Sequence, residues 1–175
     1  MKIVAFAASN SSKSINLELI KAVSKQFGEH EVEILNLNDF EMPIYSQDRN
    51  EAGIPQLALD FNKHIQESDA LIISLAEHNG SFSTAFKNIF DWGSRAEMKF
   101  FQEKPMLLLS TSPGARGGQT VMESAKGVFP YFGANIKNTF SFPSFYDNFK
   151  DGEIVNETLK QQVDEVIANF KSNLS

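Results

Sequence analysis

The chain of 175 residues carries a formal net charge of −6, and 42% of its residues are hydrophobic and 22% are charged. This composition predicts one globular domain, residues 1–175, with a buried hydrophobic core, and it excludes a disordered chain. The sequence contains no cysteine, which excludes disulfides, thiolate metal sites and a cysteine nucleophile. The negative charge disfavours nucleic acid and anionic membrane surfaces as partners.

The N-terminal half of the chain begins with a strand pattern. Residues 2–8 form a continuous apolar run, which is typical of a strand buried on both faces and is too short for a signal peptide. Residues 14–28 have apolar side chains every four positions, so we expect a helix that Gly28 stops. After them we expect a half-exposed strand, a loop and a helix at residues 31–37, 38–55 and 55–68, with Pro55 in the first turn of the helix.

The second half repeats this alternation. Continuous apolar runs at residues 69–76 and 104–112 predict two more central strands, and the more polar run 134–142 predicts a strand at the sheet edge. We expect helices at residues 83–96, from Ser83 to near Gly93, at residues 117–133 with an interruption near Pro130, and at residues 156–174. Strand and helix therefore alternate five times, which predicts a three-layer α/β/α sandwich around a parallel sheet.

The pair Asn79-Gly80 is the usual signal of a two-residue hairpin turn. Its flanks are a continuous apolar strand and a helix of period four. We therefore expect a strand-to-helix loop at this position and no hairpin.

Three polar loops follow the first, third and fourth predicted strands, at residues 9–16, 77–82 and 112–119. In open parallel sheets, ligands bind beyond the carboxyl ends of the strands. The first loop holds four serines directly before a helix, where hydroxyls and free backbone N–H groups suit a phosphate. One of them, Ser12 or Ser14, can instead cap the helix. Neither a Walker loop nor a G-x-G-x-x-G motif is present at this position.

The loops resemble those of a known family. Residues 8–16, ASNSSKSIN, resemble the G-S-L-R-x-x-S-x-N phosphate loop of the NAD(P)H-dependent FMN reductases, which include quinone, azo-dye and chromate reductases. Residues 77–92, from EHNGSF to DW, resemble the later part of the family motif P-E-Y-N-G-S-F-x-x-x-L-K-N-x-x-D-W, and residues 112–119 resemble its glycine-rich flavin loop. The resemblance covers roughly residues 2–140.

The resemblance implies a flavodoxin-like sheet of strand order 2-1-3-4-5, FMN as cofactor, and NADPH or NADH as co-substrate. A nicotinamide would pass hydride to flavin N5, and electrons would then pass to a quinone-like or other small acceptor. The implied cofactor contacts are Ser9, Ser11, Ser14, Ile15 and Asn16 at the phosphate, Ala76, Glu77, His78, Asn79 and Gly80 beneath the ring, and Ser112, Gly114, Gly117 and Gly118 beside it.

Three positions depart from the family pattern. Ala8 replaces a glycine, Ser11 replaces the arginine of the phosphate loop, and Ala76-Glu77-His78 replace P-E-Y. Loss of the arginine removes a bidentate phosphate partner and leaves Lys13 as the nearest cation. We expect substrate preference to depend on Ala76 and His78.

No catalytic residue is assigned, because the cofactor carries the chemistry. His78 is the candidate for contact with flavin or substrate, and a hydrogen bond to the backbone is its alternative role. Arg116 is a candidate for the NADPH phosphate. His30 and His64 have no second ligand at metal spacing, so we expect no metal site.

The resemblance also places helix 83–95 at a subunit interface, so we expect a homodimer or homotetramer. Core packing of its aromatic residues is the alternative. No stretch reaches the roughly 20 apolar residues of a membrane span, and we expect a cytoplasmic protein.

The sequence disfavours two functions other than that of an enzyme. A flavodoxin-type electron carrier is disfavoured because residues 76–82 hold no Trp or Tyr to stack on a flavin. A phosphorylation-controlled signalling domain needs acidic residues after the first strand and an Asp after the third, where Ala-Ser and Leu-Ala stand.

Overall fold

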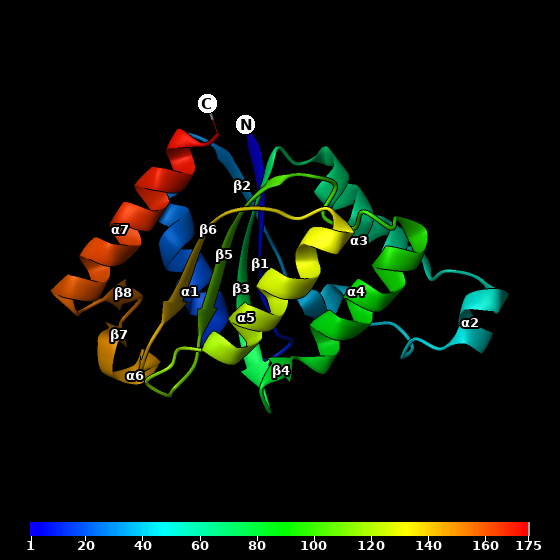
Figure 1. The fold of residues 1–175 in the computed structure, drawn as a ribbon, viewed down its shortest axis with the longest axis horizontal. Helices are drawn as coiled ribbons and strands as arrows, with labels where there is room; N and C mark the ends of the chain where they lie inside the picture. Colours follow the sequence, from blue (N-terminus) through cyan, green and yellow to red (C-terminus); the bar gives the residue numbers. More distant parts are fainter. Residues whose placement is uncertain (175) are drawn as a thin grey trace.

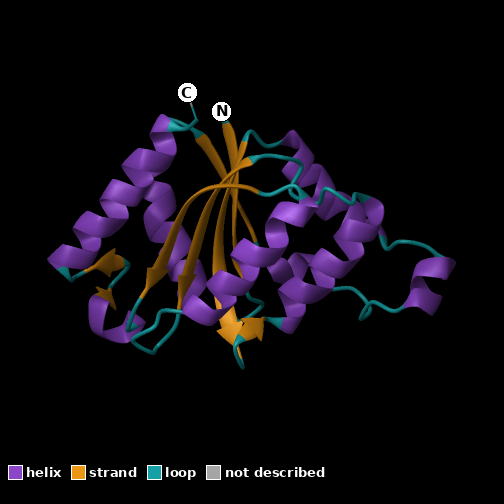
Figure 2. Ribbon diagram, in the orientation of Figure 1, coloured by secondary structure: helices purple, strands orange, loops and turns teal. Residues whose placement is uncertain are grey.

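A parallel sheet forms the centre of the molecule, with helices on both faces (Figures 1 and 2). In this computed structural model, which describes residues 1–174, the parallel strands lie in the order β2-β1-β3-β5-β6. They span Lys2–Ala8 (β1), Glu31–Leu35 (β2), Ala70–His78 (β3), Pro105–Thr111 (β5) and Asn135–Phe142 (β6). Both the predicted strand order and the edge position of the polar last strand are confirmed.

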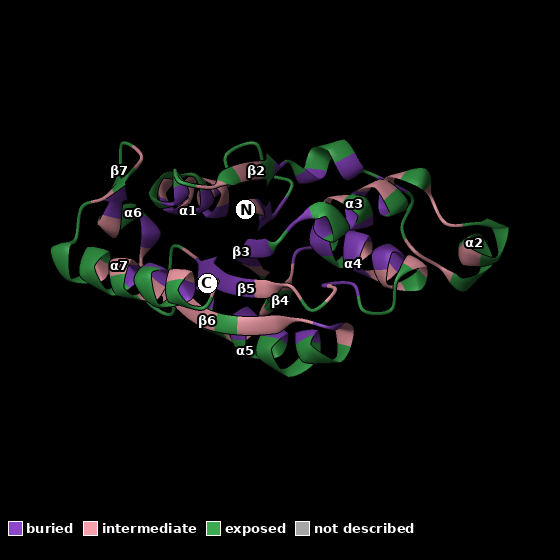
Figure 3. Cartoon of the chain, turned by 90° about the horizontal axis from the view of Figure 1, so that it is seen from above, coloured by how far each residue is buried: buried purple, intermediate pink, exposed green. Residues whose placement is uncertain are grey.

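Helices cover the two faces of the sheet unequally (Figure 3). The larger core lies beneath α3 (Gln56–Glu67), α4 (Thr84–Ala96) and α5 (Gln119–Val128), and the smaller core lies beneath α1 (Ile15–Ser24) and α7 (Glu157–Ser172). Along β1, Val4 and Phe6 enter the first core and Ile3 and Ala5 the second. Burial on both faces therefore explains why the central strands are continuous apolar runs.

Phenylalanine side chains fill much of these cores. Around Phe90, the rings of Phe86, Phe101, Phe129 and Phe132 lie 4.7–5.9 Å away between centroids. These spacings are those of favourable edge-to-face and offset aromatic pairs.

The prediction of a strand-to-helix loop without a hairpin at Asn79-Gly80 was wrong. Strand β3 continues to His78 and pairs antiparallel with the two-residue strand β4 (Ser81–Phe82). Asn79 and Gly80 have φ angles of 52° and 76°, which is the backbone of a type I′ hairpin turn. A strand of two residues is too short to appear in the hydrophobic pattern, and the helix α4 follows it at once.

The predicted loop 38–55 was also only partly correct. It contains a 3₁₀ turn, η2 (Leu37–Phe40), and the helix α2 (Gln47–Ala52), which Ser46 caps at Arg49 N. Helix α2 buries none of its residues and lies at the outer end of the molecule (Figure 1), so it has no apolar stripe to reveal it.

Two helix ends differ from prediction. Helix α1 ends at Ser24 and passes through a 3₁₀ turn, η1 (Lys25–Phe27), into Gly28, whose φ of −61° is that of an ordinary residue. Helix α4 does not stop at Gly93 but continues to Ala96. The glycine leaves room for the ring of Phe100, because a Cβ at position 93 would lie 2.3 Å from that ring.

The interruption of the fifth helix is confirmed, since α5 gives way to a 3₁₀ turn, η3 (Phe129–Phe132), that contains Pro130. Between the last strand and α7 lies a segment without a sequence prediction. It comprises α6 (Phe145–Asn148), β7 (Phe149–Lys150) and β8 (Glu153–Ile154). Within residues 1–174, no helix is both long and apolar enough to cross a bilayer.

Candidate active site

The predicted loop at residues 9–16, which we call the serine loop, joins β1 to α1 at the carboxyl end of the sheet. Ser9 and Ser14 are buried, and their hydroxyl oxygens accept hydrogen bonds from the backbone N–H groups of Ser11 at 3.2 Å and Leu17 at 3.2 Å. Ser11 Oγ accepts from Lys13 N at 3.3 Å. Ser14 therefore caps α1, as one alternative predicted. Each of these hydroxyls still has its own hydrogen to donate, because none donates to another described residue.

The first turn of α1 adds two more donors. Within the described chain, the backbone N–H groups of Ile15 and Asn16 have no acceptor, whereas Leu17 N is bound by the cap. Such free N–H groups carry the positive end of the helix dipole. The loop therefore presents both hydroxyl and amide donors to an anion.

Asn16 has a second role that its place in the motif does not reveal. Its side chain is 3% exposed, and Nδ2 donates to Thr111 O at 3.3 Å. Its Oδ1 accepts from Ser74 Oγ at 2.7 Å and from Thr111 N at 3.2 Å. The side chain thus ties α1 to β3 and β5, and its backbone N–H is the part free to meet a phosphate.

The β3–β4 hairpin forms a second wall of the site. Ala76 is buried, Glu77 is half-buried, and His78 and Asn79 are exposed. Glu77 Oε2 accepts from Val121 N at 3.0 Å and so caps α5, whose own cap position is the side-chain-free Gly118. The ring of His78 forms no hydrogen bond or ion pair with the described residues, so the alternative of a backbone partner is not realised in this structure.

The glycine-rich loop forms the third wall. Gly117 has a φ of 58°, and a Cβ there would lie 2.6 Å from Phe142 O. A Cβ on Gly118 would lie 3.2 Å from that of Ser110. Both glycines are buried, so they allow the loop to pack on β5 and β6, whereas Gly114 and Arg116 are exposed at its tip.

These three loops enclose one cavity of about 190 Å³. Nine predicted site residues line it: Ser9, Ser11, Ser14, Ile15, Asn16, Ala76, Glu77, His78 and Ser112. The other five, Asn79, Gly80, Gly114, Gly117 and Gly118, lie in the same loops but outside the cavity wall. Lys13 lines the cavity as well, as the cation expected nearest a phosphate.

Three lining residues were missed: Thr111, Pro113 and Tyr146. Pro113 lies within the predicted loop 112–119, and Thr111 directly precedes this loop. Tyr146 comes from α6, in a segment with no motif and no periodicity. Only its place in the fold reveals it.

A second cavity, of about 360 Å³, lies across His78 from the first. His78 and Asn10 line it together with residues 37–44 and the start of α4. Asn88 of α4 fixes the far wall, since Oδ1 accepts from Tyr45 N at 2.8 Å and Nδ2 donates to Met42 O at 3.1 Å. The two cavities share the His78 side chain.

The residues of α4 that match the family motif have structural roles. Phe86, Phe90 and Trp92 are buried, which realises the core-packing alternative for the aromatics, and Trp92 Nε1 donates to Pro43 O at 2.7 Å. Lys87 and Asp91 form an exposed pair one helical turn apart.

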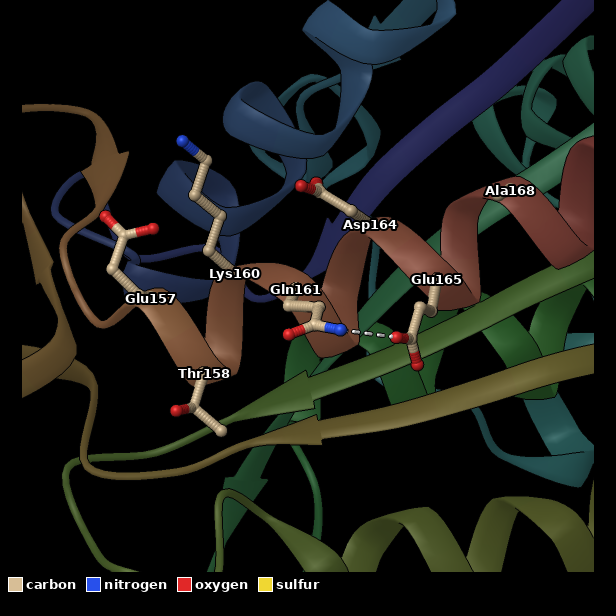
Figure 4. Close-up of a pocket in the computed structure, with 7 residues that line it drawn as sticks. All are labelled: Glu157, Thr158, Lys160, Gln161, Asp164, Glu165 and Ala168. Atoms are coloured by element: carbon tan, nitrogen blue, oxygen red, sulfur yellow. Dashed lines mark hydrogen bonds between the residues drawn. The ribbon is translucent and has the colours of Figure 1, made fainter.

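A hollow larger than either of these cavities, of about 630 Å³, lies over α7 (Figure 4). Its lining comes from a single helix, and Gln161 and Glu165 already bond to each other at 3.0 Å. It has neither convergent donors nor a second wall. Within residues 1–174, no group of three or more His, Cys, Asp or Glu residues is arranged to hold a metal ion.

The chain is similar to known proteins. The family of NADPH-dependent FMN reductases matches residues 1–147 of the chain. The chain belongs to this family. A 2-hydroxy-1,4-benzoquinone reductase of Burkholderia sp is 30% identical over 124 residues, 69% of this chain and 67% of the relative. A quinone reductase of Escherichia coli K12 is 27% identical over 128 residues, 73% of this chain and 64% of that protein.

Solved structures agree on the fold. FerB, a flavoenzyme NAD(P)H:(acceptor) oxidoreductase from Paracoccus denitrificans, superposes with a TM-score of 0.84 at 22% identity, over 99% of this chain and 96% of its own. An FMN-dependent NADH-azoreductase from Bacillus anthracis, solved in complex with FMN, has a TM-score of 0.67 at 13% identity, with both chains covered fully. The flavodoxin-like fold and the oxidoreductase class are confirmed.

The residues present fit the cofactor of the family. The serine loop offers hydroxyl and amide donors at a helix N-terminus, as a phosphate monoester requires. The same cavity continues to the backbone of the hairpin and to the glycine-rich loop. Ala76, Glu77 and His78 of the hairpin line it, and His78 also lines the second cavity.

Proposed function

We propose that this chain is an FMN-dependent NAD(P)H oxidoreductase that reduces a quinone-like or other small acceptor. The observation that carries the proposal is the convergence of the serine loop, the β3–β4 hairpin and the glycine-rich loop on one cavity. Bound FMN supplies the two-electron redox chemistry, and the residues of the chain bind and orient the reactants.

The serine loop holds the phosphate end of FMN. The hydroxyls of Ser9, Ser11 and Ser14 and the N–H groups of Ile15 and Asn16 are free to donate, and Lys13 adds a positive charge. The dipole of α1 strengthens these bonds to an anion. Asn16 keeps the donors in place through its bonds to β3 and β5.

The β3–β4 hairpin and the glycine-rich loop hold the ring end of FMN. Residues 76–80 lie at the end of the central strand, and their type I′ turn fixes the backbone that would lie beneath a flat ring. Ser112 and the exposed Gly114 approach from the neighbouring strand. Gly117 and Gly118 act indirectly, because they seat the loop on β5 and β6.

His78 lies between cofactor and co-substrate. Its ring is exposed, has no partner among the described residues, and borders both cavities. The second cavity receives the nicotinamide or the acceptor, and His78 contacts the molecule bound there. Arg116, exposed in the third loop, attracts the NADPH phosphate.

We also propose that the chain works in the cytoplasm as a homodimer or homotetramer. Exposed apolar side chains support an interface near α4, since Ile44 beside its start is 66% exposed and Met98 beyond its end is 74% exposed. Light scattering after size exclusion would give the mass, and a monomer at micromolar concentration would contradict this part.

Flavin uptake is the first experiment on the function. The purified protein should bind FMN with a shifted flavin absorbance and should oxidise NADPH or NADH when a quinone is present. A protein that takes up no FMN contradicts the proposal. A protein that binds FMN but oxidises neither nucleotide is an electron carrier.

A further inference from the structure

Tyr146 stands on the wall of the candidate cofactor cavity, although it lies outside all three predicted loops. It belongs to α6, which follows the edge strand β6. Its side chain is 64% exposed, and its hydroxyl forms no hydrogen bond with a described residue. The Tyr146 ring packs edge-on against Phe145, but its hydroxyl has no role in the fold of the described residues.

The segment that carries Tyr146 is fixed to the glycine-rich loop. Ser144 N donates to Gly114 O at 2.9 Å, and Phe145 N donates to Ser112 O at 3.1 Å. Ser144 takes up the left-handed backbone with φ 45° and ψ 57°, which is unfavourable for a residue with a Cβ. These bonds hold the segment in that conformation.

Aromatic packing holds the segment from below. The ring of Phe145 is buried and stacks on Phe149, with centroids 4.6 Å apart and planes 22° apart. It also meets Phe142 of β6 edge-on at 6.2 Å. Because Phe145 points into the core, its neighbour Tyr146 points outward, and its ring meets Phe145 at 87°.

Tyr146 lies on the same side of the sheet as the serine loop. Phe145 and the helix α1 both belong to the smaller core, whereas the hairpin leads to α4 on the other face (Figure 3). Among the lining residues, Lys13 is the one with a permanent positive charge, and Glu77 is occupied at α5. Apart from Lys13, the donors available to a phosphate in this cavity are therefore neutral, and the Tyr146 hydroxyl is one of them.

We propose that Tyr146 completes the phosphate end of the FMN site. Its hydroxyl donates to the phosphate, and its ring shields the serine loop from water. The backbone that carries the ring is already fixed, so binding need not order this segment. The proposal rests on the proposed function, since it names a further residue of the same site.

Binding of FMN and of riboflavin, which lacks the phosphate, tests the proposal by flavin fluorescence titration. Tyr146→Phe should weaken FMN binding roughly 2- to 10-fold, the effect of one hydrogen bond, and leave riboflavin binding unchanged. Tyr146→Ala should weaken FMN binding further. The matched control is Tyr131→Ala, at a tyrosine that is 78% exposed on η3 and outside the cavity, and it should bind both as the wild type does.

The outcomes separate this proposal from the function on which it rests. If wild-type protein does not bind FMN, the proposed function fails. If it binds FMN and both Tyr146 variants bind it equally well, the role of Tyr146 is overturned and the function stands. An equal loss of FMN and riboflavin in Tyr146→Phe also overturns the phosphate contact. Should Tyr146→Ala unfold, the phenylalanine variant still gives the answer.

Discussion

The carboxylate of Glu77 accepts a hydrogen bond of 3.0 Å from the backbone N–H of Val121, which joins the β3–β4 hairpin to the first turn of α5. Gly118 occupies the cap position of that helix and has no side chain to offer. The Glu77 carboxylate, which comes from strand β3, therefore replaces the missing side-chain cap of α5. Its negative charge also interacts favourably with the helix dipole. Together with the pairing of Ala76 and Thr111 between β3 and β5, this contact holds two walls of the cavity in place.

Glu77→Ala should lower the free energy of unfolding by about 1–2 kcal/mol, because it leaves the start of α5 uncapped. Glu77→Gln keeps an acceptor oxygen and should lose less. Urea denaturation measures both, with Glu123→Ala as control, since Glu123 lies exposed on the same helix and pairs only with Lys126. Equal midpoints for Glu77→Ala and Glu123→Ala would show that the cap contributes nothing.

Asn16 should prove important for stability as well as for binding. Asn16→Ala removes three hydrogen bonds to Ser74 and Thr111 and leaves buried partners unsatisfied. We expect a loss of about 2–4 kcal/mol in the free energy of unfolding. The control is Asn10→Ala in the same loop, whose side chain is exposed. A loss no larger than that of the control would contradict the structural role.

Two changes at Ser14 separate its capping from its binding role. Ser14→Ala removes both, so it should cost about 1 kcal/mol of stability and weaken FMN retention. Ser14→Asp supplies another good cap but sets a negative charge against the phosphate. It should therefore keep wild-type stability and lose FMN binding. Wild-type FMN affinity in the aspartate variant would place the phosphate elsewhere.

A charged cluster at the opposite end of the sheet gives a pH dependence. Glu33 lies 3.0 Å from Lys2 Nζ and 3.0 Å from His64 Nδ1. Burial raises the pKa of the Glu33 carboxyl, but the Lys2 and His64 partners outweigh burial and hold that pKa below the ordinary value of 4.5. Because the folded pKa is depressed, the stabilisation is present above the unfolded value and is lost as pH falls through the folded one.

Urea denaturation at a series of pH values from neutral downward checks this. Wild-type stability should fall more steeply below about pH 4.5 than that of Glu33→Gln, which cannot titrate. Parallel pH profiles of the two proteins would mean that Glu33 does not contribute.

Sequence patterns were enough for the sheet and for most of the cavity. Strands such as β1 and β5 are apolar on both faces, so every residue along them indicates a buried strand. The loops that follow these parallel strands must meet at one edge of the sheet. Ser9 and His78 could be placed for that reason.

Other features depend on contacts between distant residues. The strand β4 is two residues long, and α2 buries nothing, so neither has a periodicity to detect. The side chain of Asn16 bonds to Thr111, which lies 95 positions away in the sequence. The carboxylate of Glu77 caps α5 at Val121, which lies 44 positions away. Tyr146 reaches the cavity only because Phe145 and Ser144 are fixed by other segments.

The central claim is that the cavity at the carboxyl end of the sheet holds FMN and uses it with a pyridine nucleotide. Titration of FMN into flavin-free protein, followed by addition of NADPH or NADH and a quinone, tests it most directly. We expect saturation at a single FMN per chain and consumption of nucleotide that matches quinone reduction. Failure to bind FMN, or bound FMN that neither nucleotide reduces, would contradict it.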